Sequence, residues 1–376
     1  MKQKLYLWMM KSRRKCIVIP WVACVVVLIF FVFQTNTNTF QFLEVLNYQF
    51  FMFNSNSTKT QSINQIGKTI PALSSKAFIK QVNYTSTTKG LQTSAIYPTL
   101  ANLTHCLCPV EILGLGNRMF QFATHFAVAR SKGMRLIISK HSELNRIFKL
   151  HDIDLWDNIT ICSKFTVRLE KQNCAYDKNL LNFNSSQNIR LFPCLQSYKY
   201  FDNYTTELRK QFTFRDQIPQ EAENDLNQII KRHNIGSRRD ITLVGVHVRR
   251  TDWLNNPHGY NVATPQYMTK AVQYFKSKYQ NVMFIVSSLD LPWTRANMPN
   301  NTKVEYLSNP QREVIVATLS LCNHTITTVG SFGWWIGWLT GGEVTYFKWP
   351  AVEGTDLRKQ YSKDYSDYFY PNWIGL

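Results

Sequence analysis

The chain has 376 residues and a formal net charge of +19, from 43 lysines and arginines against 24 aspartates and glutamates. Hydrophobic residues make up 44% of it and aromatic residues 14%, which excludes a largely disordered chain. The length can bury the core of two similar lobes. The basic balance suits a nucleic acid, an anionic membrane face or a phosphorylated substrate, and does not choose among them.

The N-terminal region predicts a single membrane anchor. Six basic residues within positions 2–15 precede an uncharged apolar run over residues 16–33. As a helix this run would span roughly 27 Å, close to the hydrocarbon core of a bilayer. Because the basic residues precede the run, residues 1–15 are predicted to be cytosolic. A cleaved signal peptide is disfavoured, since the run is long and no small-x-small cleavage site follows it.

Sequons and cysteines beyond the anchor place the rest of the chain in the secretory lumen. Glycosylation is predicted at Asn56, Asn83, Asn102, Asn158, Asn184, Asn203 and Asn300. A further sequon, at Asn323, adjoins a predicted strand and is expected to be inaccessible. Six cysteines also follow the anchor, and an even number in an oxidising compartment indicates disulfides of undetermined pairing.

Residues 34–105 predict a stem, because they are rich in Asn, Gln, Ser and Thr with scattered apolar residues. The apolar cluster at 40–53 leaves an interfacial helix open as an alternative for that part. Ordered patterning begins near Cys106. Residues 106–235 are therefore assigned to a first lobe and residues 236–376 to a second.

Apolar spacing in the first lobe predicts a helix over 119–130, a strand over 135–139 and a polar helix over 221–233. After Gly236 the pattern becomes regular. Strands are predicted at 241–248, 282–287, 324–329 and 344–347, and helices at 265–279, 311–321 and 332–339. This alternation indicates an α/β fold with a parallel sheet, whose ligands bind beyond the carboxyl ends of the strands.

Two turns that run into helices are suited to phosphate. Gly114, Gly116 and Asn117 form one, and Gly330 followed by Ser331 forms the other. Backbone N–H groups at a helix N-terminus attract anions, and glycine allows a phosphate to approach the backbone closely. An ordinary tight turn explains the first of these about equally well.

A third junction follows the strongest predicted strand and contains His247, Arg249, Arg250 and Asp252. Two adjacent arginines cannot both point into the core, so at least one is expected in a cleft at the end of the strand. Guanidinium groups suit a diphosphate because they bind its oxygens in pairs. The alternative is a surface ion pair with Asp252.

Together these segments resemble the α1,2-fucosyltransferase family, from about residue 114 to 373 and most densely over 244–252 and 322–342. The resemblance implies a GT-B-like architecture of two Rossmann-type lobes, with the donor nucleotide in the C-terminal lobe and cleft. It implies GDP-fucose as donor, a glycan acceptor bound on the N-terminal lobe, and no metal or other cofactor. The same His-x-Arg-Arg-x-Asp element occurs in fucosyltransferases of other linkages, so it marks the donor rather than the linkage.

The resemblance also implies roles for single residues. Arg249 would hold the β-phosphate, His247 and Arg250 would shape the pocket, and Ser331 and Phe332 would lie at the diphosphate. Gly114, Gly116 and Asn117 would lie on the nucleotide side of the cleft, and Asp290 would accept hydrogen bonds from guanine.

Catalysis needs a general base near the arginine loop, and the candidates are Asp252 and His258. Asp252 is preferred, although it could simply orient Arg249. Asp152 and Asp154 form a D-x-D string that would suggest Mn²⁺ in another glycosyltransferase fold, but no strand-end junction supports it.

The predicted protein is a Golgi, single-pass type II enzyme that transfers L-fucose to a galactose hydroxyl in an α1,2 linkage. Transfer with α1,6 or α1,3 linkage is one alternative. A catalytically silent, lumenal glycan-binding protein is the other, although it would not need a diphosphate pocket. No acidic pair is placed for a glycosidase, and the lumenal topology excludes nucleic acid. The oligomeric state is not predicted.

Overall fold

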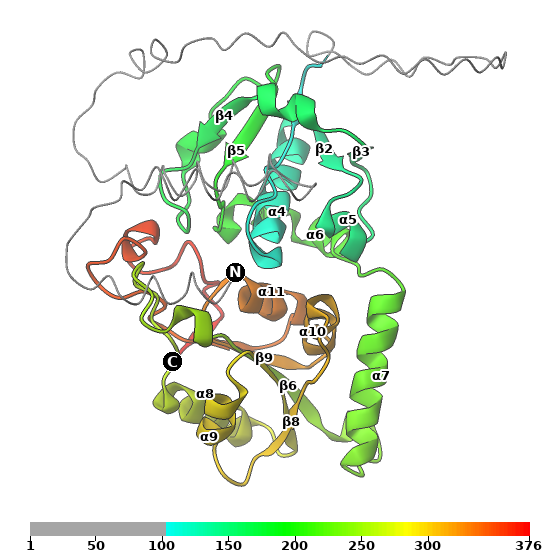
Figure 1. Ribbon diagram of the computed structural model, residues 1–376, viewed down its shortest axis with the longest axis vertical. Helices are drawn as coiled ribbons and strands as arrows, with labels where there is room; N and C mark the ends of the chain where they lie inside the picture. The colour runs from blue at the N-terminus through cyan, green and yellow to red at the C-terminus, as the bar shows by residue number, and fades with distance from the viewer. Residues whose placement is uncertain (1–102) are drawn as a thin grey trace, which may run out of the picture. The chain divides into compact units, whose positions relative to one another are not determined.

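The computed structural model describes residues 103–376 (Figure 1). The predicted anchor, most of the predicted stem and the sequons at Asn56, Asn83 and Asn102 lie outside these residues. Within residues 103–376, no helix is both long and apolar enough to cross a membrane.

The first lobe contains a parallel sheet with the strand order β3-β2-β1-β5-β4. Its strands are β1 (Cys106–Leu107), β2 (Arg135–Ser139), β3 (Asp154–Trp156), β4 (Thr166–Leu169) and β5 (Ile189–Phe192). Its α-helices are α4 (Leu115–Lys132), α5 (Glu143–Ile147) and α6 (Thr205–Gln211). Helix α4 begins one turn before the predicted 119–130 and ends at Gly133, whose φ of 63° suits glycine.

The second lobe contains a parallel sheet with the strand order β11-β10-β9-β6-β7-β8. Its strands are β6 (Thr242–Val248), β7 (Val282–Ser288), β8 (Lys303–Tyr306), β9 (His324–Thr327), β10 (Val344–Tyr346) and β11 (Ile374–Gly375). Its helices are α8 (Pro265–Lys278), α9 (Leu291–Asn297), α10 (Arg312–Ser320) and α11 (Ser331–Thr340). Two parallel-sheet α/β lobes fit the expected GT-B-like architecture.

The helices of the second lobe begin at capping residues that the sequence supplies. Thr264 accepts a hydrogen bond from the N–H of Tyr267, and Pro265 occupies the first turn of α8. Asp290 caps α9 in the same way. Gly330 precedes α11 with a φ of 100°, a conformation that a residue with a Cβ rarely adopts.

Two segments connect the lobes outside the sheets. Helix α7 (Gln217–Arg232), assigned to the first lobe from the sequence, lies beside the second lobe (Figure 1). Its Arg232 lies 2.5 Å from Glu305 of β8. The C-terminal segment 348–373 returns to the first lobe. There the backbone N–H of Cys174 donates to the Gln360 carbonyl, and Lys199 Nζ lies 2.6 Å from Asp367 Oδ1.

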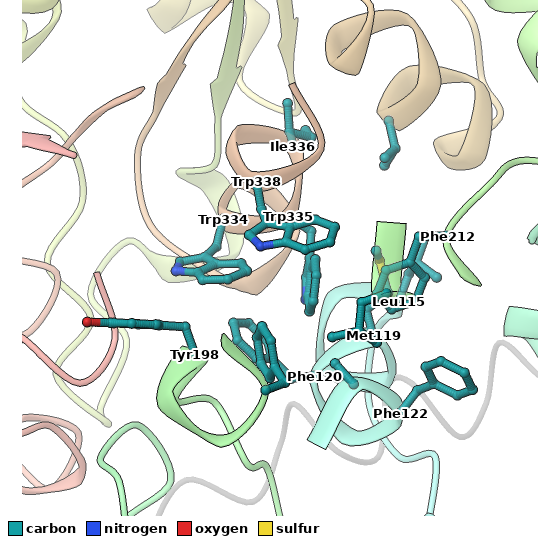
Figure 2. Close-up of a cluster of buried hydrophobic side chains, with 14 of the residues drawn as sticks. Leu115, Met119, Phe120, Phe122, Tyr198, Phe212, Trp334, Trp335, Ile336 and Trp338 are labelled. Carbon is teal, nitrogen blue, oxygen red and sulfur yellow. The ribbon is translucent and has the colours of Figure 1, made fainter. Parts of the chain in front are cut away.

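One hydrophobic core extends across both lobes. Trp334 and Trp335 of α11 are fully buried, and their rings contact Phe120 of α4, with centroids 4.6 and 5.0 Å apart. Figure 2 shows these indoles pointing from α11 toward α4. Such aromatic contacts bury large apolar areas, so they hold the lobes together.

Cys108 and Cys162 form a disulfide, which joins the residue after β1 to the 3₁₀ helix Thr160–Lys164 that precedes β4. This confirms disulfide formation for one pair. Cys106, Cys174 and Cys322 are buried thiols, and burial raises the pKa of each.

Candidate active site

The carboxyl ends of β6, β7 and β9 lie at one edge of the second sheet because these strands are neighbours and parallel. Arg249 follows β6, Asp290 follows β7, and Gly330 follows β9. The fold therefore gathers three segments predicted separately from the sequence at the edge where parallel sheets bind ligands.

Arg249 is held firmly at this edge. Its backbone N–H donates to Thr328 Oγ1 at 3.0 Å. Its Nη2 donates to Asp252 Oδ2 at 2.5 Å, and its Nε reaches both carboxylate oxygens at 3.2 Å. Within residues 103–376 its Nη1 makes no hydrogen bond, and the side chain is 31% exposed. The guanidinium is thus fixed on one side and open to a ligand on the other.

Both oxygens of Asp252 face Arg249, and this hydrogen-bonded guanidinium lowers the pKa of the carboxyl. A lower pKa makes the carboxylate a weaker proton acceptor. The geometry therefore favours Asp252 as the residue that orients Arg249. His258 is exposed in the same loop, and its backbone N–H donates to Asn256 Oδ1 at 2.9 Å.

His247 lies in β6, just before Arg249 and Arg250, and its side chain is buried, with 9% exposure. Its Nδ1 is buried without a hydrogen-bond partner in the described chain, and its ring lies 5.0 Å from that of Phe332. Burial, reinforced by the charge of Arg249, lowers the pKa of His247 to about 3. The imidazole is therefore neutral near pH 7, and Gly333 leaves room for it.

Arg250 turns away from Arg249 toward β7 and α9. Its Nη1 donates to the carbonyl of Ala263 at 3.1 Å, its Nε lies 3.5 Å from Asp290 Oδ2, and its guanidinium lies 4.3 Å from the Trp293 ring centre. Asp290 Oδ1 accepts the Trp293 N–H at 3.3 Å. Asp290 is thus placed at the predicted edge, with one oxygen capping α9 and the other beside Arg250.

The N-termini of α4 and α11 meet, although they are more than 200 residues apart in sequence. Asn117 Oδ1 accepts from Ser331 Oγ at 2.7 Å and from Gln196 Nε2 at 2.5 Å. Trp335 Nε1 donates to the Gly116 carbonyl at 2.9 Å. A Cβ on Gly116 would lie 2.6 Å from the Phe332 nitrogen, so only glycine permits this contact.

This junction presents several donors suited to an anion. The first N–H groups of a helix have no partner within the helix, and Gly114 and Gly330 cap α4 and α11 without a side-chain bond. Since both contacts that Asn117 makes within residues 103–376 use its oxygen, its amide NH₂ group is available there as a further donor. A Cβ on Gly114 would meet nothing within 4 Å, so this glycine borders open space.

The remaining predicted residues lie away from this edge. Asp154 pairs with Arg135 at 2.6 Å and Asp152 with Arg130 at 3.4 Å. Among residues 103–376, no group of three or more His, Cys, Asp and Glu side chains is placed to hold a metal ion.

The predicted glycosylation sites of the described chain are on its surface, at Asn158, Asn184, Asn203 and Asn300. Asn323 is also exposed, but its Oδ1 accepts the Leu243 N–H at 2.8 Å. Its side chain is therefore engaged by the neighbouring strand rather than buried.

Sequence reasoning missed two residues of the site. Gln196 binds Asn117 from a loop of the first lobe for which no chemistry was predicted. Trp253 lies under Arg249, with the guanidinium 4.0 Å from its ring centre. The sequence could have indicated Trp253, because it directly follows Asp252 in the segment 249–253 that contains both arginines.

Comparison with known proteins identifies the class to which these two α/β lobes belong. The family model "Glycosyl transferase family 11" matches residues 100–376, so the chain is a glycosyltransferase. It belongs to glycosyl transferase family 11.

Curated relatives agree. Galactoside alpha-(1,2)-fucosyltransferase 2 of Sus scrofa is 29% identical over 279 residues, which cover 70% of this chain and 77% of the relative. Galactoside alpha-(1,2)-fucosyltransferase 2 of Bos taurus is 30% identical over 284 residues, 70% of this chain and 76% of the relative. Among solved structures, fucosyltransferase NodZ from Bradyrhizobium matches with a TM-score of 0.39 and 12% identity, over 61% of this chain and 92% of that one.

Proposed function

We propose that the chain transfers L-fucose from GDP-fucose to O2 of a galactose residue on a glycan, with inversion at the anomeric carbon and without a metal ion. The observation that carries the proposal is the open guanidinium of Arg249 beside the joined N-termini of α4 and α11. The names of the curated relatives support fucosyl transfer and the α1,2 linkage.

The chemistry requires stabilisation of the leaving group. As the acceptor hydroxyl attacks the anomeric carbon, the bond from that carbon to the β-phosphate oxygen breaks, negative charge grows on GDP, and the hydroxyl proton passes to a general base. A preorganised cation and backbone N–H groups stabilise that charge. Arg249 is such a cation because Asp252 fixes its guanidinium, and the amide of Asn117 and the neutral imidazole of His247 complete the donor pocket.

In this proposal Arg250 and Asp290 border the nucleotide, and Ser331 and Phe332 lie at the diphosphate. The acceptor lies on the side of the first lobe. Asp252 remains a candidate for the general base, together with His258, but its two contacts with Arg249 make an orienting role the better fit.

We also propose that the enzyme is a single-pass type II protein of the Golgi membrane, glycosylated at the seven predicted sequons. This rests on the basic segment before the apolar run 16–33 and on the sequons and cysteines that follow it.

The test uses the full chain, expressed in cells without α1,2-fucosyltransferase activity and assayed with labelled GDP-fucose, a β-galactoside and EDTA. We expect fucose on galactose O2. Arg249→Ala should lower kcat at least about 100-fold, because it removes charge stabilisation of the leaving group. Arg232→Ala is the matched control, since Arg232 is also a partly exposed arginine paired with a carboxylate.

The outcomes separate the alternatives. Fucose at another position would replace the α1,2 assignment by another linkage. GDP-fucose hydrolysis without transfer would mean that the acceptor is not a β-galactoside. A wild-type chain that binds no GDP would favour the silent glycan-binding protein, and full activity of Arg249→Ala would remove Arg249 from the mechanism.

A further inference from the structure

Trp253 contacts two parts of the proposed diphosphate site, the guanidinium of Arg249 and the turn at Gly330 that begins α11. It ends the short helical turn Thr251–Trp253 that follows the arginine pair, and it is 8% exposed. The Arg249 guanidinium lies 4.0 Å from its ring centre, and the Tyr260 ring stacks on it at 4.0 Å with an interplanar angle of 20°. The guanidinium of Arg249 and the ring of Tyr260 cannot both lie 4.0 Å above the same face of the indole. They therefore lie on opposite faces, with Trp253 between them.

The edge of the same indole packs against the turn that starts α11. A Cβ on Gly330 would lie 2.6 Å from Trp253 Cη2 and 3.2 Å from Cζ3. Since Gly330 has a φ of 100° and caps α11, the position of the indole and that of the helix N-terminus depend on each other. The Trp253 side chain thus connects the Arg249 guanidinium, which follows β6, with the backbone N–H groups at the start of α11.

Tyr260, on the other face of the indole, is fixed by the C-terminal segment. Tyr260 pairs with Ala351 in an antiparallel bridge, and the N–H of Val352 donates to the Gly259 carbonyl at 2.9 Å. The loop that contains Trp253 is therefore also held by contacts with the C-terminal segment.

We propose that Trp253 is a positioning residue that holds the Arg249 guanidinium and the N-terminus of α11 in register for the donor diphosphate. The inference rests on the proposed function. An arginine side chain has many rotamers, and Asp252 restrains it only along one edge. Contact with the indole face restrains its plane, so less reorganisation is needed when charge develops.

The experiment compares the full-length wild type with Trp253→Phe, Trp253→Leu and Trp156→Leu. Kd for GDP, kcat, KM for GDP-fucose and Tm are measured for each. Trp253→Phe keeps an aromatic face and should stay within about 3-fold of wild-type kcat, while Trp253→Leu should lose about 10-fold or more. Trp156→Leu is the matched control, because Trp156 is a partly buried tryptophan of β3 in the first lobe.

Equal kcat and GDP affinity in Trp253→Leu and Trp253→Phe would overturn the positioning role while leaving the proposed function intact. Failure of the wild type to bind GDP would overturn both. If Trp253→Leu does not fold, Gly330→Ala is measured in the wild type and in Trp253→Phe. Because Gly330 has a φ of 100°, the alanine strains the backbone in both chains, and only the difference between the two losses reports the contact of the added Cβ with the indole, whose outer atoms the shorter phenyl ring lacks. Gly330→Ala should therefore lower kcat less in Trp253→Phe, and equal losses would overturn the proposal.

Discussion

At the level of individual residues, Asp252 either orients Arg249, which it contacts with both carboxylate oxygens, or acts as the general base. The variant Asp252→Asn should distinguish these two roles. Asp252→Asn keeps an oxygen that can accept from Arg249 but removes the charge. If Asp252 orients Arg249, kcat/KM should fall about 10-fold, since a charge-assisted contact is replaced by a neutral one. The affinity for GDP should fall with it. Steady-state kinetics and GDP calorimetry measure both.

A different result would restore Asp252 as the general base. Removal of a base costs typically about 10²–10⁴-fold in rate and leaves donor binding intact. A loss of kcat beyond about 100-fold with unchanged Kd for GDP would therefore contradict the orienting role. His258→Gln serves as the comparison, because it removes the other candidate base in the same loop.

Glu170 is a second residue whose surroundings make a sharp prediction. Its Oε1 accepts from the N–H groups of Cys194 and Leu195 at 2.9 and 2.7 Å, whereas its Oε2 is buried without a hydrogen-bond partner in the described chain. Burial outweighs the two hydrogen bonds and raises the pKa of the carboxyl from 4.5 to about 8. The folded protein thus keeps this proton at pH 7, while the unfolded chain loses it.

Because the folded state binds more protons here, the contribution of Glu170 to stability is fully present below about pH 4.5 and is lost as the pH rises toward 8. Glu170→Gln cannot ionise. Relative to wild type, its free energy of unfolding should therefore increase with pH across this window, by up to about 1.4 kcal/mol per pH unit. Urea unfolding at several pH values measures the difference. The exposed Glu207→Gln is the control, and a flat difference for Glu170→Gln would contradict the burial argument.

At the level of secondary-structure elements, the contact between α4 and α11 depends on the absence of a side chain at Gly116. In Gly116→Ala the new Cβ would lie 2.6 Å from backbone atoms of both Ser331 and Phe332. Backbone cannot move as a side-chain end can, so we expect a loss of about 1–3 kcal/mol in the free energy of unfolding. Donor affinity should fall too, because the helix N-termini are pushed apart.

Gly114→Ala supplies the control, two residues away in the same turn. Its Cβ would meet nothing within 4 Å, and its φ of −74° is accessible to alanine. The thermal unfolding of the two variants should therefore differ clearly. Equal stability for both would show that the two helices do not meet as described.

The second lobe was largely predictable from the sequence because its elements carry strong local signals. The predicted strand 241–248 and helix 265–279 correspond to β6 and α8 within one residue at each end. The predicted strand 324–329 ends two residues early, at Thr327, because Val329 and Gly330 form the turn into α11. The phosphate-suited segments at Arg249 and Ser331 were found because each directly follows such a strand.

The first lobe was less predictable for physical reasons. Strands β3 and β4 have three and four residues, too few for a reliable period, and β4 exposes Val167 and Leu169. The roles of Gln196 and Trp253 depend on contacts made only after folding. The partner of Cys108 lies 54 residues away, and sequence spacing carries no information on such a pair.

At the level of the whole described chain, both lobes share their core and exchange segments. Helix α7 pairs with β8, and the C-terminal segment pairs with the first lobe. An ion-pair cluster adds to this, since Glu143 of α5 contacts Arg312 of α10, and Arg146 lies 2.5 Å from Glu313. The lobes are therefore expected to unfold together, although each has its own sheet.

Trp335 tests this expectation, because its ring reaches Phe120, Phe201 and Phe212 of the first lobe at centroid distances of 5.0, 5.6 and 5.1 Å. Trp335→Ala should lower the free energy of unfolding by about 3–5 kcal/mol, because it removes a fully buried indole. Hydrogen exchange should then accelerate in β2 of the first lobe and β6 of the second by the same factor. Trp349→Ala, at a half-exposed tryptophan, is the control. Faster exchange in β6 alone would mean that the lobes unfold independently and that the shared core packs two domains already stable by themselves.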